Sequence, residues 1–128
     1  MKILITGAAG FVGFHSAARL LAAGHEIFGI DNLNSYYDVS LKDGRLVQLQ
    51  RNANFSFLKL DLADREGMAQ LFRENAFDVV LHLGAQAGVR YSLDNPFAYV
   101  DSNITGTLTV LEGCRHYGVK HLIYASSS

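Results

Sequence analysis

Short apolar runs alternate with longer amphipathic segments along this chain, and the alternation predicts strands and helices in turn. The expected strands are residues 2–6, 26–30, 55–61, 78–85 and 121–127. The expected helices are residues 11–24, a surface helix within 31–52, 64–75 and about 96–117. The strand runs are apolar throughout, which is typical of strands buried on both faces. The pattern therefore predicts an α/β fold with a parallel sheet covered by helices on both sides.

Residues that favour helix ends support these limits. Gly24 closes the first expected helix as a left-handed cap, and Asp64 can cap the third. Pro96 and Gly118 bracket the last helix. Because crossovers between parallel strands are right-handed, the five strands favour the order 3-2-1-4-5. The expected ligand site is the crevice at the carboxyl ends of the strands, where the order reverses.

Composition and charge place the chain among compact globular proteins. Its 128 residues are 49% hydrophobic and 18% charged, which suits one domain, residues 1–128, with a sizeable core. The formal net charge of -1 provides no basic surface for a polyanion, so we expect no nucleic-acid partner. The five histidines and Cys114 show no metal-ligand spacing, so we expect no metal.

The N-terminal apolar run has two interpretations, a secretory signal and a strand–turn–helix. Residues 3–14 are interrupted by Gly7, Gly10 and Gly13 at a spacing of three, which the strand–turn–helix explains. No stretch approaches the roughly 20 apolar residues of a membrane span, so we expect no membrane partner. A single cysteine fits a reducing compartment, and we expect a cytoplasmic protein.

The turn after the first strand carries a glycine motif, TGAAGFVG, at residues 6–13. Its small residues allow a pyrophosphate to approach the backbone, and the amides and positive dipole of the next helix would meet the negative charge. A glycine-rich turn selected only for tight packing is the alternative, but the flanking strand and helix favour a Rossmann-type doubly wound domain. The candidate cofactor residues of this turn are Gly7, Gly10, Phe11, Val12 and Gly13.

Asp31 ends the second strand, 18 positions after Gly13. A carboxylate at this spacing accepts hydrogen bonds from the ribose hydroxyls of adenosine and repels a 2′-phosphate. Asp31 therefore predicts selection of NAD over NADP, with a solvated strand-end aspartate as the alternative.

Five further segments resemble the extended short-chain dehydrogenase/reductases, the family of NAD-dependent sugar-nucleotide epimerases and dehydratases. The segments are DNLN (31–34), DL (61–62), HLGAQAGVR (82–90), DSNITGT (101–107) and YASSS (124–128). The segments AQAGVRYS and YASSS are most similar to those of UDP-glucuronate 4-epimerases, and less similar to those of UDP-glucose epimerases or dTDP-glucose dehydratases. The resemblance covers essentially the whole chain, and it implies NAD as cofactor and a UDP-sugar as substrate.

The resemblance also implies the remaining cofactor residues. They are Asn32, Asn34, Asp61, Leu62, Leu83, Gly84, Ala85, Gln86, Ser102 and Asn103. Asp61 would accept from the exocyclic amine of adenine and the Leu62 amide would donate to the ring, although Asp61 could instead only lead the next helix. Ser102 matches a cofactor contact and Asn103 a site-organising position. The family more often has alanine where this chain has Gly84.

Two residues match substrate positions of the family. Arg90 lies in the expected loop that borders the sugar nucleotide, and its planar fork suits a carboxylate or phosphate; an ordinary surface arginine is the alternative. Ser127 matches the catalytic serine or threonine that hydrogen-bonds the reacting hydroxyl of the sugar, with a polar strand end as the alternative. His82, inside an apolar strand, is interpreted as a core histidine and not as a ligand.

The implied reaction is 4-epimerisation, in which the sugar is transiently oxidised by bound NAD and reduced again on the opposite face. The family's general base is the tyrosine of a Tyr-x-x-x-Lys motif, and none of the four lysines here follows a tyrosine at that spacing. We therefore expect a chain truncated relative to the family fold, without the later strands and the substrate domain.

Such a chain is expected to bind NAD weakly without turning over UDP-sugars. A non-enzymatic NAD-binding module and a truncated or redesigned scaffold without function are the alternatives. The strand at 121–127 forms an expected apolar sheet edge, which predicts a homo-oligomer or self-association through that edge.

Overall fold

A computed structural model describes residues 1–34 and 38–126 as an α/β fold with a single parallel sheet. The strands are β1 (Lys2–Thr6), β2 (Glu26–Asp31), β3 (Phe55–Lys59), β4 (Val79–His82) and β5 (His121–Tyr124). All neighbouring pairs are parallel and the order is β3-β2-β1-β4-β5, which confirms the predicted order.

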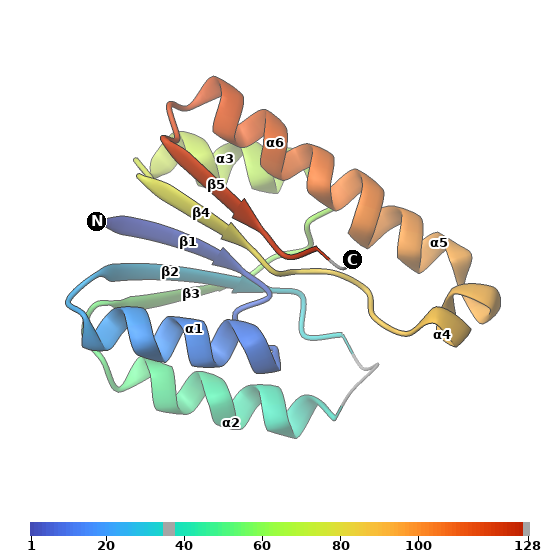
Figure 1. Cartoon of the computed structure of the whole chain (residues 1–128), viewed down its shortest axis with the longest axis horizontal. Coiled ribbons are helices and arrows are strands. Elements are labelled where there is room, and N and C mark those ends of the chain that lie inside the picture. The colour runs from blue at the N-terminus through green and yellow to red at the C-terminus, as the bar shows by residue number, and fades with distance from the viewer. Residues whose placement is uncertain (35–37, 127–128) are drawn as a thin grey trace.

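Helices cover both faces of this sheet (Figure 1). The helical elements are α1 (Phe11–Ala22), α2 (Val39–Gln50), α3 (Arg65–Glu74), α4 (Val89–Asp94), α5 (Pro96–Tyr99), the π-helical turn η1 (Val100–Thr105) and α6 (Gly106–His116). The helices α1 and α2 lie on one side, and α3 and α6 lie on the other. This is the doubly wound arrangement that the hydrophobic pattern predicted.

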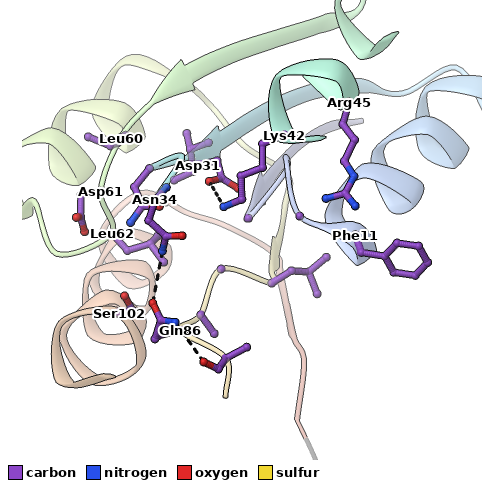
Figure 2. Close-up of a pocket in the computed structure, with 18 of the residues that line it drawn as sticks. Phe11, Asp31, Asn34, Lys42, Arg45, Leu60, Asp61, Leu62, Gln86 and Ser102 are labelled. Atoms are coloured by element: carbon purple, nitrogen blue, oxygen red, sulfur yellow. Dashed lines mark hydrogen bonds and ion pairs between the residues drawn. The ribbon is translucent and has the colours of Figure 1, made fainter. Parts of the chain in front are cut away.

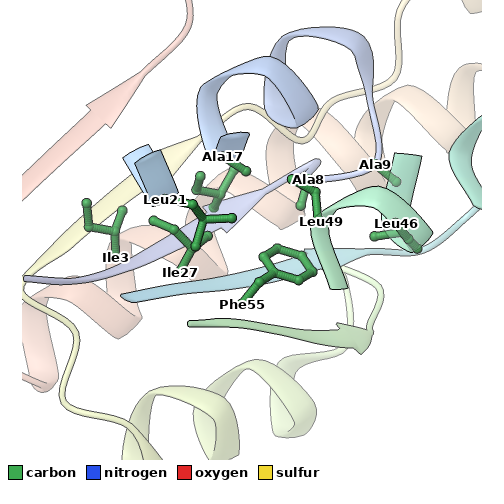
Figure 3. Close-up of a cluster of buried hydrophobic side chains, with 10 residues drawn as sticks. Ile3, Ala8, Ala9, Ala17, Leu21, Ile27, Leu46, Leu49 and Phe55 are labelled. Atoms are coloured by element: carbon green, nitrogen blue, oxygen red, sulfur yellow. The ribbon is translucent and has the colours of Figure 1, made fainter. Parts of the chain in front are cut away.

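Two buried clusters, one on each face, hold the layers together. On the side of α1 and α2, one cluster contains Ile3 of β1 and Ile27 of β2 together with Leu46 and Leu49 of α2 (Figure 3). On the other side, Leu4 of the same strand packs in a second cluster with side chains of α3 and α6. Because successive side chains of a strand point to opposite faces, a strand covered on both sides must be apolar at every position.

Three strands are shorter than predicted, because the chain leaves the sheet before its apolar run ends. The third ends at Lys59 and not at 61, and the fifth ends at Tyr124 and not at 127. The fourth ends at His82, after which the amides of Leu83 and Gly84 donate to the Thr6 hydroxyl at 3.0 and 2.9 Å. Residues 83–85, which were predicted to continue this strand, line a cavity instead.

The region between β4 and β5 differs most from the prediction. Arg90 was expected in a loop, but it lies in the short helix α4, which begins after Gly88 with φ at 95°. The expected single helix over 96–117 is divided into α5, η1 and α6. Asn95 begins α5 by accepting a hydrogen bond from the Ala98 amide at 3.2 Å. At the first helix, Gly24 has φ at 91°, which confirms its left-handed cap, although α1 ends at Ala22.

Candidate functional site

A cavity of about 420 Å³ opens at the carboxyl ends of β1, β2 and β4 (Figure 2). The candidate residues that line it are Gly7, Gly10, Phe11, Asp31, Asn32, Asn34, Asp61, Leu62, Leu83, Gly84, Ala85, Gln86 and Ser102. It lies where the strand order reverses, which is the position that the topology predicted.

The glycine turn forms the floor of this cavity beside β1. Gly7 has φ at 71°, and a Cβ there would lie 2.9 Å from the backbone of Gly84. A Cβ at Gly13 would lie 2.0 Å from the carbonyl oxygen of Gly7, so α1 can begin against the turn only without a side chain at that position. Among the residues that the structure describes, no side chain caps α1 and no acidic residue lies in its first turn, so its N-terminal amides can receive an anion.

Asp31 links the glycine turn to α2. Its carboxylate accepts from the Ala9 amide at 3.2 Å through Oδ2 and from the Leu33 amide at 2.8 Å through Oδ1. The Lys42 ammonium group lies 3.2 Å from the same Oδ1, and both side chains are at least nine-tenths buried. A buried carboxylate held by two amides and an ammonium group is a fixed acceptor at the rim of the cavity.

Gln86 and Asn103 fix the loop that follows β4. Asn103 accepts from the Gln86 amide at 2.8 Å and donates to the Gln86 carbonyl at 3.2 Å. The Gln86 side chain lies at 3.5 Å from the Asn34 amide group, so this loop and the loop after β2 face each other across the cavity (Figure 2). Asn103 therefore organises the cavity from outside it.

Several other candidate residues lie apart from the cavity lining. Gly13 and Val12 lie in α1, where Gly13 is buried behind the turn and the Val12 side chain is exposed. Arg90 is exposed on α4, and Ser127 lies outside the described residues.

Asp61 does line the cavity, and its carboxylate also accepts a hydrogen bond from the Ala63 amide at 2.9 Å, in a turn that precedes α3.

The structure adds two cations that the sequence interpretation missed. Lys42 and Arg45 project from α2 into the cavity, and Arg45 donates to the Ala9 carbonyl at 3.0 Å. Residues 42, 46 and 49 form the buried stripe of α2, whereas Leu41 is exposed to the extent of 57%. A lysine at helical spacing from two core leucines is the signal that could have identified this position.

His82 is a satisfied core histidine, as predicted. Its Nδ1 lies 2.7 Å from the Thr6 hydroxyl and its Nε2 lies 3.2 Å from the Thr107 hydroxyl. Burial lowers the pKa of His82 because the charged form is poorly solvated there.

Metal-binding clusters and membrane-spanning helices are both absent from the described residues. Over residues 1–34 and 38–126, no group of three or more His, Cys, Asp and Glu side chains could hold a metal ion. Within the same ranges, no helix has the length and apolar character needed to cross a membrane.

A parallel sheet that brings a glycine turn and a strand-end carboxylate to one cavity defines the Rossmann-type dinucleotide-binding class. Within this class the chain belongs to the GDP-mannose 4,6-dehydratase family, whose family model matches residues 4–128.

Two relatives align with nearly the whole of this chain. The chain is 60% identical to an uncharacterized 37.6 kDa protein of Escherichia coli O111:H-, over 100% of this chain and 38% of that protein. It is 47% identical to the UDP-glucuronate 4-epimerase of Thermodesulfobacterium geofontis, over 98% of this chain and 39% of that enzyme.

A solved structure shares the architecture closely. It is the UDP-glucuronic acid 4-epimerase of Bacillus cereus in complex with UDP-glucuronic acid and NAD, with a TM-score of 0.89 and 38% identity. The match covers 100% of this chain and 40% of that chain. The protein described here thus spans about two fifths of the length of its relatives.

Proposed function

We propose that this chain is the NAD-binding portion of a UDP-sugar 4-epimerase, with UDP-glucuronate as the favoured substrate of the complete reaction. The observation that carries the proposal is the meeting of the glycine turn and the Asp31 carboxylate in one cavity. Relatives that carry the UDP-glucuronate 4-epimerase name, at 47% identity, support the substrate.

The residues present fit NAD. The glycine turn presents backbone atoms to the cavity, since a Cβ at Gly13 would collide with the Gly7 carbonyl oxygen, and backbone amides at a helix N-terminus suit a pyrophosphate. Asp31 would accept hydrogen bonds from the adenosine ribose hydroxyls, and Asp61 with Leu62 would face adenine on the opposite rim. Leu83 to Gln86, with Ser102, would line the rest of the cofactor.

The protein's own part in the chemistry is positioning. When bound, NAD supplies the hydride acceptor and donor that 4-epimerisation needs. Asn103 holds the Gln86 backbone and so fixes the wall of the cavity. Arg90 would face the sugar nucleotide, and Ser127 would hydrogen-bond its reacting hydroxyl. The proton of that hydroxyl needs a base of the Tyr-x-x-x-Lys type, which this sequence does not contain.

Titration calorimetry of the 128-residue chain with NAD tests the first half of the proposal. We expect saturable binding with one site per chain, and a rise in the thermal unfolding midpoint that grows with NAD concentration. Absence of both signals in a folded sample would refute an NAD-binding role and would favour a scaffold without function.

Incubation of the same chain with NAD and UDP-glucuronate tests the second half. Because the base is absent from the sequence, we expect no UDP-galacturonate by proton NMR. Detection of the epimerised sugar would contradict the assignment of the missing chemistry to Tyr-x-x-x-Lys.

We also infer that the chain associates with a second copy of itself through β5. This strand has one neighbour in the described sheet, and its Ile123 and Tyr124 side chains are exposed. An unpaired apolar strand can add a further strand of another chain.

A further inference from the structure

Two cations of α2 face the end of the cavity that contains Asp31. Lys42 and Arg45 are three residues apart on this helix, so their side chains lie on neighbouring positions of one face. Figure 2 shows both side chains directed from α2 toward the strand ends and the glycine turn. Lys42 contacts the Asp31 carboxylate at 3.2 Å, and Arg45 contacts the Ala9 carbonyl at 3.0 Å.

Lys42 is unusual because it is buried. Only 8% of the residue is exposed, and it continues the stripe formed by Leu46 and Leu49. A lysine at such a position costs free energy unless its charge has a partner, and Asp31 is that partner. The carboxylate that faces a ribose is therefore half of an ion pair, not an isolated negative charge.

The pair changes the electrostatics expected at the ribose. Asp31 alone would present one negative charge to a phosphate group, but Lys42 balances it and Arg45 adds a positive charge nearby. If a neutral residue replaces Asp31, this end of the cavity is lined by the Asp38 carboxylate, the Lys42 ammonium group and the Arg45 guanidinium group, so two positive charges remain against one negative charge. The two positive groups are the side chains that bind phosphomonoesters in proteins.

We propose that Lys42 determines which adenine dinucleotide the cavity accepts, and that Lys42 and Arg45 form a phosphomonoester site masked by Asp31. The proposal rests on the proposed function, in which this cavity binds NAD. With Asp31 ionised, Lys42 holds the carboxylate toward the ribose hydroxyls. With a neutral residue in place of Asp31, Lys42 and Arg45 bind the 2′-phosphate of NADP.

Calorimetric titration of NAD and NADP into three proteins tests this proposal. The wild-type chain should bind NAD at least about tenfold more tightly than NADP, because Asp31 accepts a hydrogen bond from the ribose 2′-hydroxyl of NAD and already pairs with the Lys42 ammonium group. The Asp31→Asn variant should change that ratio about 100-fold in favour of NADP. The Asp31→Asn/Lys42→Met double variant should lose most of this gain, because the phosphate loses its ammonium partner.

Two further variants separate the site from a general charge effect. Asp43, which follows Lys42 in α2, is exposed, and Asp43→Asn removes one negative charge as Asp31→Asn does. This variant should leave the ratio of NAD affinity to NADP affinity within about twofold of wild type. Lys42→Met with Asp31 intact leaves the carboxylate without its cation, so discrimination against NADP should increase about tenfold. This variant decides the question if Asp31→Asn, which leaves Lys42 buried and unpaired, does not fold.

The outcomes distinguish this proposal from the proposed function. If the wild-type chain binds NAD but Lys42→Met leaves the NAD/NADP ratio unchanged, the role of Lys42 is refuted and NAD binding stands. If the wild-type chain does not bind NAD, adenosine 2′,5′-bisphosphate is titrated into Asp31→Asn. Binding that depends on Lys42 then supports the phosphate site and refutes the NAD assignment, and absence of binding in a folded sample refutes both.

Discussion

At the scale of single residues, His82 connects β1, β4 and the helical region after β4 through hydrogen bonds. The Thr6 hydroxyl accepts from the amides of Leu83 and Gly84, so both its lone pairs are used and its proton must be donated to His82 Nδ1. The Nε2 of His82 then carries the ring proton and donates to the Thr107 hydroxyl. This network fixes one neutral tautomer, which sequence periodicity alone could not reveal.

Protonation of His82 should destabilise the fold. Burial lowers its pKa below the ordinary value of 6.5, so the unfolded chain binds the proton first as the pH falls. The free energy of unfolding should therefore decrease below about pH 6.5, by up to about 1.4 kcal/mol per pH unit, until the folded pKa is reached. Chemical denaturation between pH 5 and pH 8 measures this slope.

A His82→Gln variant tests whether that slope belongs to His82. We expect lower stability at pH 8, because one ring hydrogen bond is lost, but a flatter dependence between pH 5 and pH 6.5. The exposed His121 supplies a control, since His121→Gln should retain the wild-type slope. An unchanged slope in His82→Gln would assign the pH dependence to other groups.

Gly13 illustrates a second requirement at this scale, close approach of two backbone segments. A methyl group at Gly13 would lie 2.0 Å from the Gly7 carbonyl, so Gly13→Ala should cost about 2 kcal/mol or more of stability and prevent NAD binding. Gly44 in α2 has nothing within 4 Å of a built Cβ, so Gly44→Ala should stabilise the chain by about 0.5–1 kcal/mol. Thermal unfolding with and without NAD compares the two. Equal effects would contradict a special role for the turn.

The sequence identified the glycine turn and Asp31 because their spacing is a local property. It did not identify Lys42, since the decisive fact is the contact of this lysine with a carboxylate 11 residues away in another element. Nor did it show that Asn103 stands behind the cavity and not in its wall. Side-chain partners depend on how the elements pack, and periodicity does not encode that.

At the scale of elements, the helical region after β4 was predicted least well. Residues 96–117 read as one amphipathic helix, but the π-helical turn η1 interrupts them at Ser102 and Asn103. A π-helical turn is a local change of the backbone hydrogen bonds from i→i+4 to i→i+5, and the order of apolar and polar residues does not indicate where that change occurs. The six-residue helix α4 was missed because it follows a glycine and is too short to show a period.

Asn103 of η1 holds the loop after β4 through its hydrogen bonds to Gln86. Asn103→Leu keeps the side-chain size but removes both hydrogen bonds to the Gln86 backbone, so the loop after β4 should lose its fixed position. We expect NAD affinity to fall about tenfold while the fold remains intact by circular dichroism. Asn54→Leu, an exposed change far from the cavity, is the control. Unchanged affinity in Asn103→Leu would show that the loop is held by other contacts.

At the scale of the whole molecule, the strand order followed from the sequence because few topologies satisfy right-handed crossovers between adjacent parallel strands. The same order places β3 and β5 at the two edges of the described sheet. These edges differ in chemistry. Leu58 and Lys59 are both exposed on β3, and an exposed lysine opposes pairing with another chain, whereas Ile123 and Tyr124 at the end of β5 are exposed without a charged neighbour in that strand. Self-association should therefore use β5.

Sedimentation velocity over a range of concentrations tests this last prediction. The wild-type chain should show a concentration-dependent increase in sedimentation coefficient, and Ile123→Lys should shift the distribution toward the monomer, because it places a charge on the unpaired edge. Leu93 on α4 is 82% exposed, so Leu93→Lys removes an apolar side chain that is more exposed than Ile123 but lies outside the sheet, and should leave association unchanged. Equal dissociation by both variants would indicate non-specific hydrophobic contact. A wild-type chain that sediments as a monomer at all concentrations would refute association through β5, since an edge that pairs must respond to mass action.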